Sequence, residues 1–66
     1  MTIWRQADGA PIACVEKLKV LADNERELRA VMSDAFDDAV LMGVDHAQMR
    51  LTLIEMVESL PGPGRR

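Results

Sequence analysis

The side chains that could take part in chemistry are few in this sequence, and they are scattered along it. The chain has one cysteine, Cys14, and one histidine, His46. A thiol near a helix start is activated by the helix dipole, and an imidazole binds metals or titrates near neutral pH. Their plainer interpretations are a small buried hydrophobe and a solvated residue of a first helical turn. One Cys and one His fall short of the four ligands of a structural zinc site, so we expect no metal and no cofactor.

Three aspartates, Asp34, Asp37 and Asp38, form an acidic block. Asp34 and Asp38 are one helical turn apart, so their carboxylates could share a cation. A single helix supplies too few oxygens for a calcium cage, and we interpret the group as a solvated face that could serve as a partner surface. No nucleophile, base and orienting group can be recognised together. We therefore do not expect an enzyme.

Apolar residues recur at alternating steps of four and three along the first half of the chain, which is the pattern of one helical face. They are Cys14, Leu18, Leu21, Leu28, Met32, Ala35, Ala39 and Met42, with Glu25 as the one interruption. The pattern predicts a helix over residues 11–42, with Pro11 in its first turn. A capping box at Asn24 and Glu27 would instead begin a new helix there and give a three-helix monomer. The apolar register stays in phase across residues 21–28, which favours one continuous helix.

A turn and a second helix follow. Gly43 suits the left-handed position after a helix, and Asp45 with Gln48 forms a capping box. The second helix is predicted over residues 46–60, and the Pro-Gly pairs from Pro61 onward end it. Residues 1–10 form a lead-in with a turn at Asp8-Gly9, whose Ile3 and Trp4 fold over the start of the first helix. Residues 61–66 form a flexible tail of this single domain, residues 1–66.

The two predicted helices differ about twofold in length, so the second can reach back only to about Leu28. The second helix is apolar around most of its circumference, which indicates that it is covered on more than one side. A single chain of 66 residues buries only about 60% of its unfolded surface, so a monomer would be marginally stable. We therefore expect an all-α fold, a two-helix antiparallel hairpin with a long first helix that dimerises into a four-helix bundle. The predicted dimer interface comprises Cys14, Leu18, Leu21, Glu25, Leu28, Met49, Leu53, Met56 and Leu60.

Glu25 admits two interpretations. A single polar residue on an apolar seam often fixes the register or the partner number of packed helices, and Glu25 could pair with Arg29 or with a basic residue of a second chain. Alternatively, the helices splay at this point and Glu25 reaches water.

Charge and composition limit the classes of partner. The net charge is −3, which does not favour a nucleic-acid or anionic-membrane surface. Four basic residues of the first helix alternate with acidic ones and have no aromatic neighbours: Lys17, Lys19, Arg26 and Arg29. We therefore do not expect nucleic-acid binding. No apolar run approaches the roughly 20 residues of a membrane span, and a lone thiol without an export signal indicates a cytoplasmic protein.

Two stretches carry a resemblance to known proteins. They are Trp4-Arg5, Asp8-Gly9, Pro11, Cys14 and Glu16–Leu21 in the first half, and Asp34–Gly43, Asp45 and Gln48 in the second. They resemble a family of short proteobacterial helical-hairpin proteins with no known activity, which implies a bacterial cytoplasmic protein. In length and layout only, the chain is also similar to Rop, the plasmid copy-number protein, whose hairpins dimerise into a four-helix bundle and bind RNA.

These patterns together lead to one expected function and two alternatives. We expect a small homodimeric accessory or regulatory protein that acts through protein–protein interaction, with a second copy or with a larger protein. One alternative is a Rop-like RNA-binding four-helix bundle. The other is a metal or redox module at a dimer axis, built from Cys14 or from Asp34 and Asp38.

Overall fold

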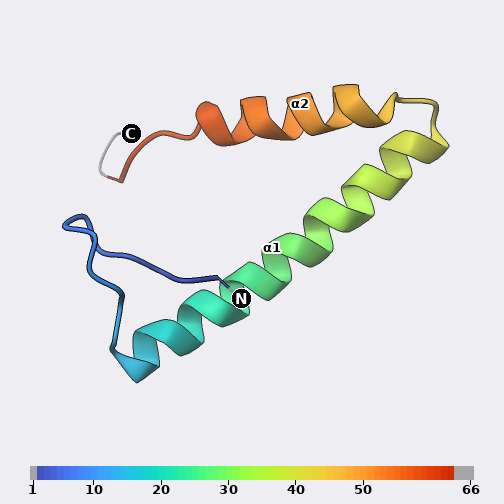
Figure 1. The fold of residues 1–66 in the computed structure, drawn as a ribbon. Helices are drawn as coiled ribbons and strands as arrows, with labels where there is room; N and C mark the ends of the chain where they lie inside the picture. The colour runs from blue at the N-terminus through green and yellow to red at the C-terminus, as the bar shows by residue number, and fades with distance from the viewer. Residues whose placement is uncertain (1, 64–66) are drawn as a thin grey trace. The chain divides into compact units, whose positions relative to one another are not determined.

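The computed structural model describes residues 2–63 and has two helices in contact as a hairpin (Figure 1). The long helix α1 spans Val15–Leu41, and α2 spans His46–Glu58. The predicted all-α class and the long first helix are confirmed. The chain divides into two compact units, one ending at Val31 and the other beginning at Met32, and α1 runs through both. The predicted tail lies outside the described residues from position 64 onward.

The lead-in forms a small β-ribbon over residues 4–12, an element that the sequence analysis did not predict. Its turn is the predicted Asp8-Gly9 turn, in which the Gly9 amide donates to the Gln6 carbonyl at 2.9 Å. Gly9 has a φ of +92°, the left-handed conformation that glycine adopts without strain. The Gln6 amide donates in turn to the Ala10 carbonyl at 2.7 Å. This pattern is a hairpin with a type I turn and a glycine bulge.

The prediction that Pro11 begins the first helix is wrong. Pro11 instead pairs with Arg5 in an antiparallel bridge of the ribbon, and α1 begins at Val15. The bonded pairs on either side are Gln6 with Ala10 and Trp4 with Ile12, so Pro11 occupies a position from which no ladder hydrogen bond is donated. A proline is tolerated at such a position as well as in a first helical turn.

The first helix is continuous, as the in-phase apolar register across residues 21–28 predicted. α1 passes through Asn24 and Glu27 without interruption, so the alternative of a second helix beginning at Asn24 is wrong. Asp23 and Arg26 form an ion pair at 3.2 Å within this stretch. The i, i+3 pair supports the helix across the point where a break was considered.

The turn between the helices has the predicted chemistry. Gly43 has a φ of +100°, its amide donates to the Val40 carbonyl at 3.0 Å, and the Val44 amide donates to the Ala39 carbonyl at 2.9 Å. These two bonds define a Schellman motif, which satisfies the last carbonyls of a helix. The Asp45 carboxylate then accepts from the Gln48 amide at 3.1 Å. Asp45 is therefore the N-cap of α2, as predicted.

α2 ends two residues before the predicted end at Leu60. Ser59 is its C-cap, and the Ser59 amide donates to the Glu55 carbonyl at 3.0 Å. Because the ring of Pro61 disfavours helical angles in the preceding residue, Leu60 leaves the helix.

Very little of the described chain is fully buried. Ala39, with 8% of its surface exposed, is the only buried hydrophobic residue within residues 2–63. Phe36, Val40, Met49 and Leu53 are half-buried in the unit that begins at Met32, which also contains Ala39. Neither helix in the described part of the chain has the length and apolar character that a membrane crossing requires.

Candidate interaction surfaces

The α1 stripe, which we define as Leu18, Leu21 and Glu25, is half-buried within the first unit. The three residues follow each other at i, i+3 and i+7 and so share one helical face. Glu25 accepts a hydrogen bond from Arg29 Nε at 2.8 Å, and 26% of the Glu25 side chain is exposed. The predicted pairing of Glu25 with Arg29 is therefore confirmed. Arg29, together with a hydrogen bond from Thr2, holds the pKa of the Glu25 carboxyl below its usual value.

The ribbon has one half-buried face and one exposed face. Trp4, Ala10 and Ile12 are half-buried, whereas Arg5 and Pro11 between them are exposed. This is the period-2 alternation of a strand pair that packs on one side. The half-buried residues of the ribbon and of the α1 stripe belong to the same unit, in which α1 is the one helix among the described residues.

Of the two apolar residues predicted to fold over the helix start, Trp4 is half-buried, and its position over the helix stays a prediction. Ile3 is 63% exposed, because it lies on the exposed side of this alternation. In Figure 1 the ribbon, drawn in blue, leads into the first turn of α1.

A second apolar face of α1 is exposed. It consists of Val20 at 57%, Leu28 at 61% and Val31 at 66% exposure, and we call it the lateral face of α1. Leu28 and Val31 are neighbours at i, i+3, and Val20 lies on the same side of the helix. Asn24 and Glu27 border the hollow between Leu28 and Val31. The lateral face therefore continues the predicted stripe at Leu28 and extends it sideways.

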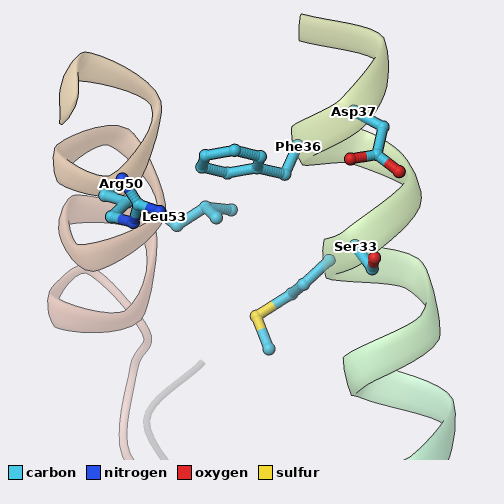
Figure 2. Close-up of a pocket in the computed structure, with 6 residues that line it drawn as sticks. Ser33, Phe36, Asp37, Arg50 and Leu53 are labelled. Carbon is cyan, nitrogen blue, oxygen red and sulfur yellow. The ribbon is translucent and has the colours of Figure 1, made fainter. Parts of the chain in front are cut away.

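In the second unit, α1 and α2 meet around Phe36. The Arg50 guanidinium lies 5.0 Å from the centre of the Phe36 ring, within range of a cation–π contact. The His46 ring meets the same ring edge-on at 5.7 Å and 81°. Figure 2 shows Phe36 projecting from α1 toward Arg50 and Leu53 of α2, with Ser33 and Asp37 on the α1 side. The hollow between them measures about 310 Å³ and is open to solvent.

α2 carries an exposed apolar face of its own. Met49 and Leu53 are half-buried, whereas Leu51 and Ile54 are 50% and 52% exposed. Ala47, Leu51 and Ile54 lie at i, i+4 and i+7, so they share one side of the helix. We call them the outer stripe of α2. The face of α2 that contains Met49 and Leu53 is thus partly covered in the single chain, and the outer stripe is not.

The residues predicted for a dimer interface fall into two groups. Leu18, Leu21, Glu25, Met49 and Leu53 are half-buried in the single chain. The other four are exposed: Cys14, Leu28, Met56 and Leu60. Sequence analysis did not assign the outer stripe of α2 to that interface. The signal was present in the spacing of Ala47, Leu51 and Ile54, but the sequence alone does not say which apolar face of α2 the first helix takes.

The candidate chemical residues lie apart from one another. Cys14 is a free, exposed thiol just before α1, so it is not buried within the single chain, and its burial in a dimer stays a prediction. His46 is exposed at the first residue of α2, as predicted. Asp34, Asp37 and Asp38 are exposed on α1, and their role as a partner surface stays a prediction. Within residues 2–63, no group of three or more Cys, His, Asp or Glu side chains is placed to hold a metal ion.

Two of the four basic residues considered for RNA binding have acidic partners on α1. Arg26 pairs with Asp23, and Arg29 pairs with Glu25. Both guanidinium groups remain largely exposed, but each has a carboxylate beside it. No observation here favours the Rop-like alternative over protein contact.

Comparison with known proteins identifies no family for the chain. No protein-family model matches it, and neither a curated protein nor a solved structure matches it. The class that the geometry defines is therefore a two-helix hairpin with exposed apolar faces, and the proteobacterial resemblance stays an expectation.

Proposed function

We propose that the chain is a small homodimeric helical protein that acts in the bacterial cytoplasm, through protein–protein contact, as an accessory or regulatory factor. One observation carries this proposal. Among the described residues one hydrophobic residue is buried, whereas fourteen large hydrophobic residues are exposed, including Leu28, Leu51 and Ile54. Where such residues gather on one exposed helical face, as Leu28 and Val31 do, they support an interaction site.

The apolar faces favour a second copy of the chain as the partner. The lateral face of α1 and the outer stripe of α2 are both helical surfaces with i, i+3 and i+4 spacing, which pack well against other helices. In a symmetric dimer the same face of both subunits forms the interface, so an exposed stripe of one subunit is covered by the same stripe of the other. Two hairpins joined in this way would form the predicted four-helix bundle.

Sedimentation equilibrium with a matched pair of α1 variants tests the proposal. Leu28→Glu puts a charge on the lateral face, whereas Ala30→Glu puts the same charge on the exposed, opposite side of α1. We expect the wild type and Ala30→Glu to be dimers at micromolar concentration and Leu28→Glu to be a monomer. Equal dimerisation of both variants would remove the lateral face from the interface. A monomeric wild type would overturn the homodimer and leave a different protein as the partner.

A further inference from the structure

The exposed lateral face of α1 continues toward both ends of the helix. α1 is one continuous helix from Val15 to Leu41, so residues that follow each other at steps of three and four share one side of it. We call the residues at these steps the lateral seam, and every one of them is exposed: Lys17, Val20, Asn24, Leu28, Val31, Ala35 and Asp38. The lateral seam is therefore an uncovered surface with apolar residues in its interior and an opposite charge at each end.

The lateral seam is symmetric about the midpoint between residues 27 and 28. Lys17, Val20 and Asn24 precede that midpoint by the same numbers of residues by which Asp38, Ala35 and Val31 follow it. Two identical helices that pack antiparallel about a twofold axis at the midpoint place each member of the first group opposite its counterpart in the other copy. Lys17 then meets Asp38, Val20 meets Ala35, and Leu28 lies beside the axis.

The charges at the ends of the lateral seam favour this antiparallel arrangement over a parallel one. The ion pairs within residues 2–63 join Arg26 to Asp23 and Arg29 to Glu25, so Lys17 and Asp38 have no ion-pair partner among the described residues. A parallel pair of copies would place Lys17 against Lys17 and Asp38 against Asp38, whereas the antiparallel pair places opposite charges together at both ends.

The unfavourable contact of the antiparallel arrangement lies at its centre. There Glu27 approaches Glu27 of the second copy, because the axis passes beside it. Glu27 borders the apolar hollow of Leu28 and Val31 and is exposed, so water and salt screen this repulsion. Two Lys17–Asp38 pairs stand against one Glu27–Glu27 contact, which leaves the charge balance in favour of the antiparallel register.

We infer that a second copy of this chain packs antiparallel along the lateral seam, with Lys17 of each copy paired with Asp38 of the other. This inference rests on the proposed homodimer and adds to it the orientation of the two chains and their register. It also gives one member of the acidic block, Asp38, a specific residue to contact in the partner.

A charge exchange tests the pairing. Lys17→Asp and Asp38→Lys each place like charges together at both ends of the antiparallel dimer, whereas the double variant Lys17→Asp/Asp38→Lys restores opposite charges. Each single substitution puts the sign of charge that the helix dipole favours at its end of α1, so weaker association cannot come from a weaker helix, and circular dichroism checks the helix content. Lys19→Asp is the matched control, because it changes the net charge equally on another side of α1.

Sedimentation equilibrium at low salt measures the dimer Kd of these variants. We expect each single variant to raise Kd about tenfold, because two symmetry-related ion pairs are replaced by two like-charge contacts. The double variant and Lys19→Asp should each stay within about threefold of the wild type.

Two results would overturn the inference, and they differ in what else they remove. If the wild type is a dimer but both single variants keep its Kd, or the double variant does not regain it, Lys17 and Asp38 are not paired, while the homodimer stands. A single-chain mass for the wild type at every concentration removes the homodimer and the pairing together.

Discussion

Replacing Leu51 by Asp should weaken self-association while leaving the single hairpin intact. Leu51 lies at the centre of the outer stripe of α2 and is 50% exposed in the single chain. Full burial of a leucine side chain stabilises by about 1.5–3 kcal/mol, so the exposed half contributes about 1 kcal/mol when a partner covers it. Both subunits of the variant dimer lose this stabilisation. The free energy of dimerisation is then less favourable by about 2 kcal/mol, which raises Kd about thirtyfold. The cost of burying a carboxylate adds to this value.

The matched control for this variant is Thr52→Asp. Thr52 is the next residue of α2, lies on its polar side and donates its hydroxyl to the Gln48 carbonyl at 3.0 Å. The Thr52→Asp substitution therefore introduces the same charge away from the outer stripe. Sedimentation equilibrium measures both Kd values, and circular dichroism checks that the helix content is retained. A Kd for Leu51→Asp within threefold of that for Thr52→Asp would refute the assignment of the outer stripe to the interface.

Three further predictions concern stability. Gly43→Ala should lower Tm by several degrees, because the φ of +100° strains any side chain and the folded state loses about 1–2 kcal/mol of stability. A Tm equal to or above that of the wild type in thermal denaturation would contradict this. Asp45→Ala should lower the free energy of unfolding, measured by chemical denaturation, by about 1 kcal/mol. Asp45→Asn should lower it much less, since Asn can also accept from the Gln48 amide. Equal losses in the two variants would contradict the capping role. The lowered pKa of Glu25 means that its pairing with Arg29 stabilises the fold above the usual Glu pKa of about 4.3 and is lost as the pH falls through the lowered value. Denaturation midpoints of Glu25→Gln should therefore depend less on pH below about 5 than those of the wild type, and identical profiles would contradict the pairing.

Features set by a few neighbouring residues could be predicted from the sequence. The Schellman turn at Gly43, the cap at Asp45 and the pair of Glu25 with Arg29 each depend on side chains within five positions of one another. The continuity of α1 also follows from a local property, because the apolar register stays in phase across residues 21–28. In these cases the local preference and the fold agree, so the pattern alone is enough.

The position of Pro11 and the end of α2 show where the sequence reasoning was incomplete. Proline is compatible with the first turn of a helix and with a ribbon position that donates no hydrogen bond, so Pro11 by itself does not decide between them. The alternation of Trp4 and Ile12 about Asp8-Gly9 was the available signal for a hairpin. For α2, the restriction that Pro61 imposes on Leu60 was readable in the sequence.

The interaction surfaces were predictable only in part, for a different reason. The spacing of apolar residues indicates which of them share a face, but α2 has two such faces, one with Leu53 and one with Leu51. Which face packs within the chain depends on the turn at residues 43–45 and on the partner side chain Phe36. That information is three-dimensional, and the structure supplies it through the contacts of Phe36 with Arg50 and His46.

Native mass spectrometry of the purified wild-type protein tests the central claim most directly. The account predicts a species of twice the chain mass of 7.3 kDa at micromolar concentration, with no additional mass bound. A single-chain mass across the concentration range would contradict the claim that the exposed apolar faces of α1 and α2 are covered by a second copy.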